Sequence, residues 1–214
     1  MKEIDRFYNR LDDNQKELYD RLIDKNTIVV SSNSKAGTGK STIAVMAALE
    51  LLEEGRIDHI YYVRFTSDRA LKLGFLPGDE SEKEAIFMGP FYDACLEFGV
   101  TDQQVNEMII TNQVILCTDI GLRGCNIENS FVIIDEAQNA HFADLKLVLT
   151  RIHDSCKVAL IGHSGQVDNY KSKEKENAFV RYIEHLIKKP WVKNINLTKN
   201  YRGKLATWAD ELEE

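Results

Sequence analysis

Short runs of β-branched and aliphatic residues alternate with longer amphipathic stretches along this chain. The apolar spacing within Leu11–Ile23 predicts an amphipathic helix, and the run Thr27–Val30 after it is typical of a strand. Further helices are predicted over 41–52, 82–98, 102–108 and 143–152, and further strands over 60–63, 114–118, 131–134, 158–161 and 195–197. Because such strands are buried on both faces, we expect a three-layer α/β/α sandwich with a mostly parallel sheet.

One long connection interrupts this alternation. The stretch 65–81 contains Gly74, Pro77 and Gly78 and is predicted to be irregular, which in a compact domain often marks a functional segment. No internal repeat, proline-rich linker or low-complexity stretch divides the 214 residues. We therefore expect one domain over residues 1–214.

A glycine-rich segment follows the first predicted strand. Residues 34–41 read Ser-Lys-Ala-Gly-Thr-Gly-Lys-Ser, which matches the Walker A pattern G-x-x-x-x-G-K-[ST] except at its first position, where Ser34 replaces glycine. Gly37 and Gly39 let the backbone curl with its N–H groups inward, and a helix that begins near Lys40 adds its positive end. The pattern predicts a polyphosphate site, although a glycine-rich turn that merely joins a strand to a helix is the alternative.

The expected roles within this loop follow from its chemistry. Lys40 would bridge the β- and γ-phosphates, and the Ser41 hydroxyl would ligate Mg²⁺. The nucleotide-binding residues predicted here are Ser34, Lys35, Ala36, Gly37, Thr38, Gly39, Lys40, Ser41 and Thr42. If the loop needs a positive φ at Ser34, serine costs about 1 kcal/mol there.

A second motif is an apolar strand that ends in two acids. Phe131–Ile134 leads into Asp135-Glu136-Ala137-Gln138, which is the Walker B arrangement. Asp135 would hold Mg²⁺ through water, and Glu136 would polarise the attacking water as general base. The alternative is an acidic helix start. We expect the phosphate loop to meet these acids at the sheet edge, from the neighbouring strand.

Composition restricts the classes of protein. Hydrophobic residues make up 43% of the chain, and the longest apolar runs fall far short of the roughly 20 residues of a membrane span. The amino terminus lacks the apolar stretch of a secretory signal, so we expect a cytoplasmic protein. The four cysteines and five histidines lack metal-site spacing, so no transition-metal site is expected.

The net charge of −7 argues against a protein that coats nucleic acid nonspecifically. A local basic groove is still compatible with it. Lys188-Lys189 and Lys199–Lys204 could build such a groove, or could form ordinary solvated faces.

Together these motifs resemble the PhoH-like ATPases of bacteria and their viruses over nearly the whole chain. The motifs that carry the resemblance are Ala36–Lys40, Leu73–Asp79 (Leu-Gly-Phe-Leu-Pro-Gly-Asp), Leu122–Gly124, Asp135–Asn139 and Leu149–Ile152. The resemblance implies a RecA-like P-loop fold, ATP hydrolysis with Mg²⁺, and a homo-oligomer, a hexamer in related proteins.

A wider similarity links the chain to the first RecA-like domain of superfamily 1 helicases. It implies that Gln15, after Asn14, contacts adenine, that Gln166 senses the γ-phosphate, and that Arg202 in Leu-Thr-Lys-Asn-Tyr-Arg acts as an arginine finger. His163 replaces the acid that usually precedes the sensor glutamine. Gln15 could instead be a helix-surface amide and Arg202 a salt-bridge partner, while Arg123 could face a neighbouring subunit, an RNA strand or solvent.

Two functional classes follow from these motifs. The first is an ATPase coupled to RNA or single-stranded nucleic acid, in a helicase-like manner. The second is a nucleotide-controlled assembly or binding module that turns ATP over slowly and has no nucleic-acid substrate. A small-molecule kinase would use the same loop, but the Asp-Glu-Ala-Gln element is of the helicase type.

Overall fold

In the computed structural model, which describes residues 2–65, 80–117, 122, 124–166 and 177–210, all strand pairs are parallel. The described residues form a six-stranded sheet in the order β3-β2-β4-β5-β1-β6. The strands are β1 Val29–Asn33, β2 His59–Arg64, β3 Val114–Cys117, β4 Ser130–Asp135, β5 Lys157–Gly162 and β6 Val192–Asn194.

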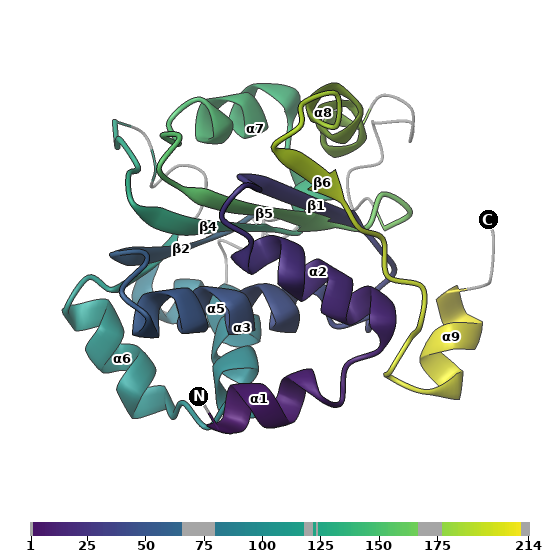
Figure 1. Ribbon diagram of the computed structural model, residues 1–214, viewed down its shortest axis with the longest axis horizontal. Coiled ribbons are helices and arrows are strands. Elements are labelled where there is room, and N and C mark those ends of the chain that lie inside the picture. Colours follow the sequence, from purple (N-terminus) through teal and green to yellow (C-terminus); the bar gives the residue numbers. More distant parts are fainter. Residues whose placement is uncertain (1, 66–79, 118–121, 123, 167–176, 211–214) are drawn as a thin grey trace.

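Helices cover both faces of this sheet (Figure 1). One face carries α1 Lys2–Tyr8, α2 Asp13–Ile23, α3 Lys40–Glu53, α5 Glu80–Glu97 and α6 Asp102–Ile110. The other carries α7 Phe142–Leu149 and α8 Ala178–Leu186, while α9 Lys204–Asp210 stands beside the body. The predicted three-layer α/β/α sandwich of the RecA-like type is therefore confirmed.

Alternation along β4 shows how one strand serves both layers. Phe131 and Ile133 belong to the apolar cluster under α2, α3 and α5, whereas Val132 and Ile134 belong to the cluster under α7 and α8. All six residues of β4 are buried. The strand therefore carries its terminal Asp135 to a fixed place at the carboxyl edge of the sheet, where ligands bind in such folds.

Helix α3 is held on nearly all sides. Its residues Ile43–Leu49 are buried without interruption, and the helix packs on the sheet and against α2 and α5. A helix that is apolar all round belongs in the interior of a domain. Its amino-terminal end, where the phosphate loop finishes, is therefore rigidly placed.

We predicted that the strand before the phosphate loop and the strand that ends in the two acids are neighbours, and this was wrong. β5 lies between β1, which precedes the phosphate loop, and β4, which ends in the two acids. The loop and the acids still meet, because parallel strands all end at the same edge of the sheet.

The predicted strand 195–197 was also wrong, since the last strand is β6, three residues earlier. Val192–Asn194 pair with β1, and the Ile195 N–H still donates to the Ser31 carbonyl. Beyond that point side-chain oxygens replace the backbone partners. The Asn196 amide oxygen accepts from the Asn33 N–H, so no ladder can continue.

The remaining differences concern positions. β1 begins two residues later than predicted, and α1, α8 and α9 were not predicted. The stretch 66–79, which includes the motif Leu73–Asp79, and Arg123 lie outside the described residues. Among the helices that the structure describes, none is long and apolar enough to cross a bilayer.

Candidate nucleotide site

The phosphate loop turns on two glycines. Gly37 has φ 76° and Gly39 has φ 88°, a left-handed backbone that L-residues with side chains adopt only at a cost. Gly39 is the N-cap of α3, and no side chain caps that helix end. A helix start without a capping side chain leaves its first-turn N–H groups available to an anion. The anticipated backbone cost at Ser34 does not arise, since Ser34 has no positive φ.

Hydrogen bonds to the Asp135 carboxylate join the loop to the strand that ends in the acids. The Ser41 hydroxyl donates to Asp135 Oδ1 at 3.1 Å, and the Glu136 N–H donates to the same oxygen at 2.9 Å. From β2, the buried Tyr62 hydroxyl donates to Asp135 Oδ2 at 2.6 Å. Each carboxylate oxygen thus has a donor that fixes its direction.

Burial and neighbouring charge set the electrostatics of this pair. Burial, followed by the charge of Glu136, raises the pKa of Asp135, although the Tyr62 hydrogen bond, Arg64 and Lys40 oppose the shift. Burial lowers the pKa of Lys40, and the carboxylates of Asp135 and Glu136 oppose that change. Two acids and a lysine are thus crowded at one edge, a pattern typical of functional sites.

Glu136 sits in strained backbone. Its φ of 52° and ψ of 37° are left-handed, which is uncommon for a residue of this size. Its carboxylate accepts from Gln138 Nε2 at 2.6 Å and lies 3.9 Å from the Arg64 guanidinium. Such strain persists only where the surroundings hold it, and it clusters at functional sites.

Gln138 connects Glu136 to the segment after β5. Its amide oxygen accepts from the His163 N–H at 3.0 Å, and Nε2 also lies 3.4 Å from the Gln166 carbonyl. Gly162 allows this approach, because a Cβ there would lie 2.4 Å from the Gln138 amide oxygen. The predicted sensor Gln166 is therefore linked to Glu136 through Gln138, by its backbone.

Gln15 is part of the loop's support. Its amide oxygen accepts from the Asp12 N–H in a capping box of α2, and Nε2 donates to the Thr38 carbonyl at 2.9 Å. Gln15 is buried, so it is not a helix-surface amide. The adenine contact stays a prediction.

A cavity of about 610 Å³ collects most of the predicted residues. It is a size typical of small-molecule sites. Of the predicted set, it is lined by Gln15, Ala36, Gly37, Gly39, Lys40, Ser41, Thr42, Asp135, Glu136 and Arg202. Ser34, Lys35, Thr38 and Gln166 do not line it, and Ser34 and Thr38 are buried behind the loop.

The site includes three residues for which no role was predicted, namely Tyr62, Arg64 and Gln138. Tyr62 and Arg64 lie near the end of β2, which pairs with β4 so that Arg64 stands opposite Asp135. A charged residue that ends an otherwise apolar strand was the available signal for Arg64. Nothing in the sequence marked Tyr62, because a buried tyrosine in a strand is ordinary.

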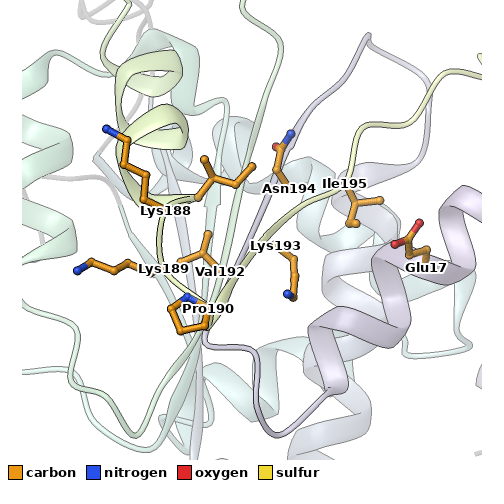
Figure 2. A pocket seen from close by; sticks show the side chains of 9 residues that line it. Glu17, Lys188, Lys189, Pro190, Val192, Lys193, Asn194 and Ile195 are labelled. Atoms are coloured by element: carbon orange, nitrogen blue, oxygen red, sulfur yellow. The ribbon is translucent and has the colours of Figure 1, made fainter.

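A second hollow, of about 550 Å³, lies beside β6 and contains the predicted basic pair Lys188-Lys189 together with Lys193. Figure 2 shows these three lysine side chains pointing in different directions, with Glu17 of α2 at the far side. The lysines therefore form an open basic surface and do not converge on a single point.

The combination of a parallel sheet, a glycine loop at the start of a buried helix and acids at the edge of the sheet defines a P-loop NTPase, a class that binds nucleotides. The model of the family described as PhoH-like protein matches residues 9–212. The chain therefore belongs to the PhoH-like family.

Three relatives illustrate the similarity. A PhoH-like protein of Synechocystis sp. is 36% identical over 138 residues, which cover 64% of this chain and 42% of the relative. A protein PhoH2 of Thermobispora bispora is 33% identical over 92% of this chain and 45% of the relative. For a protein PhoH2 of Mycolicibacterium smegmatis the values are 31%, 94% and 46%. The chain thus spans less than half the length of these curated relatives.

The strain at Glu136 has a measurable consequence. Glu136→Gly and Glu136→Ala both remove the carboxylate, but only glycine relaxes the left-handed backbone. We expect the glycine variant to be more stable in urea unfolding by about 1 kcal/mol. At Glu128, which lacks a positive φ, the order should reverse, with alanine the more stable. The same order at both sites would contradict strain at Glu136.

Proposed function

We propose that this chain, as one domain over residues 1–214, hydrolyses ATP to ADP and phosphate with Mg²⁺. The observation that carries the proposal is the single cavity in which the phosphate loop, Lys40, the Ser41–Asp135 pair and Glu136 meet. The same residues hold phosphates, a metal and a water in phosphoryl transfer.

The phosphates belong at the loop. N–H groups from the loop and from the start of α3 would surround the β- and γ-phosphates, and Lys40 would neutralise their charge. Burial lowers the pKa of Lys40, whereas the nearby acids oppose that change. A triphosphate beside Lys40 would add negative charge and would therefore favour the charged ammonium form.

The oxygens of Ser41 and Asp135 fit Mg²⁺, which prefers hydroxyl and carboxylate ligands. They lie 3.1 Å apart at the mouth of the loop, and Asp135 is almost fully buried. Ser41 would bind the ion directly and Asp135 through water. Bound Mg²⁺ would neutralise charge that develops on the phosphates.

Glu136 would act as the general base that activates the attacking water, and Gln138 and Arg64 hold its carboxylate in place. Arg202 would stabilise charge on the γ-phosphate as an arginine finger. Gln166 would sense the γ-phosphate and would act on Glu136 through Gln138, which contacts both residues. Gln15 would contact the adenine next to the loop.

Two substitutions test the hydrolysis. Lys40→Ala should weaken nucleotide binding, because it removes the cation that the phosphates face. Glu136→Gln should retain binding and lower kcat by at least about a hundredfold, because the general base is lost. Phosphate release and fluorescent-nucleotide binding measure both effects, with Lys25→Ala as an exposed lysine outside the loop and the cavity for comparison. Full turnover by Glu136→Gln would exclude Glu136 as the base.

We propose that hydrolysis is coupled to RNA or single-stranded nucleic acid. The helicase-like order of the sequence motifs supports this. The net charge of −7 opposes binding of nucleic acid as a whole. The basic surface of Lys188, Lys189 and Lys193 could still contact the phosphate backbone locally. The alternative is a nucleotide-controlled assembly module. Stimulation of the ATPase rate by single-stranded RNA, falling with salt, would favour the first; no stimulation by any nucleic acid would favour the second.

We further propose a homo-oligomer, a hexamer by family resemblance, in the cytoplasm. The resemblance to PhoH-like ATPases supports this assembly, in which a neighbouring copy would pack near the ATP site. Light scattering of the ATP-bound Glu136→Gln variant should then give a multiple of the chain mass, whereas a strict monomer would contradict the proposal.

The Tyr62 hydroxyl provides a sharper test of the metal site. Tyr62→Phe removes one donor from the Asp135 carboxylate but no carbon atoms. We expect half-maximal ATPase activity to need about tenfold more Mg²⁺, with little change at saturating Mg²⁺. Tyr61→Phe, on the opposite face of the same strand, is the control. An equal shift in both variants would refute a role of Tyr62 in metal binding.

A further inference from the structure

The residue that departs from the Walker A pattern makes its own contacts. Ser34 is 3% exposed, and its N–H donates to the Gly162 carbonyl at the end of β5. Its hydroxyl oxygen accepts from the Leu197 N–H at 2.7 Å and lies 2.8 Å from the Ser32 hydroxyl. Glycine at this position could not provide the bond to Leu197.

Leu197 belongs to the segment that carries Arg202. After β6 the chain runs past the end of β1 toward α9 (Figure 1). Two further contacts hold this segment to the phosphate loop and to the start of α2. The Tyr201 N–H donates to the Gly37 carbonyl at 2.8 Å, and the Tyr201 hydroxyl donates to Asp12 Oδ2 at 2.8 Å. Within the segment, the Asn200 amide oxygen accepts from the Arg202 N–H.

The segment also packs directly against the glycine of the loop. A Cβ on Gly37 would lie 2.7 Å from the Asn200 amide oxygen and 2.8 Å from Arg202 Cγ. Arg202 consequently lines the same cavity as Lys40 and Glu136 of its own chain. Its position therefore depends on how firmly residues 197–201 are held on the loop.

We propose that Ser34 is a positioning residue, whose hydroxyl pins the segment 197–202 to the phosphate loop so that Arg202 serves the nucleotide of its own subunit. The pin lies five residues before Arg202 and inside the loop itself, so a bound triphosphate and the arginine share one support. The inference rests on the proposed ATP hydrolysis only for its kinetic consequence.

The chain offers a closely matched control. Ser31 is 1% exposed and its hydroxyl donates to Asn194 Oδ1 at 2.9 Å, so it also ties β1 to the carboxyl-terminal part of the chain. That bond lies within the sheet, before the segment turns toward the loop. Ser31→Ala therefore removes a similar hydrogen bond without touching the pin.

Hydrogen exchange tests the pin without any need for activity. In Ser34→Ala the amides of Leu197 and Tyr201 should exchange about tenfold faster than in the native chain, because one hydrogen bond is worth about that factor. In Ser31→Ala they should exchange at the native rate. Ser34→Gly, which restores the common pattern, should behave like Ser34→Ala and serves if the alanine variant folds poorly.

Kinetics test the consequence. Ser34→Ala should lower kcat for ATP about tenfold with little change in KM, and should add less than about twofold to the loss caused by Arg202→Ala, because both act through one group. Unchanged exchange at Leu197 and Tyr201, or full additivity with Arg202→Ala, would overturn the proposal. A native chain without ATPase activity would instead refute the proposed function, and the exchange comparison would still decide whether Ser34 pins the segment.

Discussion

The hydrogen bond from the Ser41 hydroxyl to the Asp135 carboxylate joins two groups that are 94 residues apart in the chain. It forms only if α3 begins and β4 ends at the same edge of the sheet, with β5 correctly placed between β1 and β4. The uninterrupted burial of β4 and of the core of α3 enforces that register. Most of the apolar sequence thus serves to hold one serine opposite one aspartate.

Around this bond, neighbouring residues hold the side chain of Glu136 in place. Glu136 lies in left-handed backbone at a short turn, and Gln138 links its carboxylate to His163, directly after the strand β5 that separates the two motifs. Gly162 leaves the space that this glutamine needs. β5 and the residue after it therefore connect the phosphate loop to Glu136, the proposed general base.

Much of this could be predicted from the sequence, because the signals were local. Glycine, lysine and serine in Walker A spacing locate the loop, and an apolar strand ending in Asp135 locates the acids. The partners contributed by other strands could not be predicted, since Tyr62 meets Asp135 only through the pairing of β2 with β4. The prediction that the two motif strands are neighbours was wrong for the same reason. The prediction of a strand over 195–197 was wrong because side-chain oxygens, and not the apolar pattern, decide where the hydrogen-bond ladder stops. Ser34 looked like a defect in a motif, and its hydroxyl contact depends on a segment 163 residues away.

Calorimetric titration of the chain with ATP, in the presence and absence of Mg²⁺, tests whether the phosphate loop and Asp135 form one nucleotide site. We expect saturable binding of one ATP per chain that tightens when Mg²⁺ is added, since Ser41 and Asp135 then contribute to the same complex. Absence of adenine-nucleotide binding at millimolar concentrations with Mg²⁺ present would contradict it.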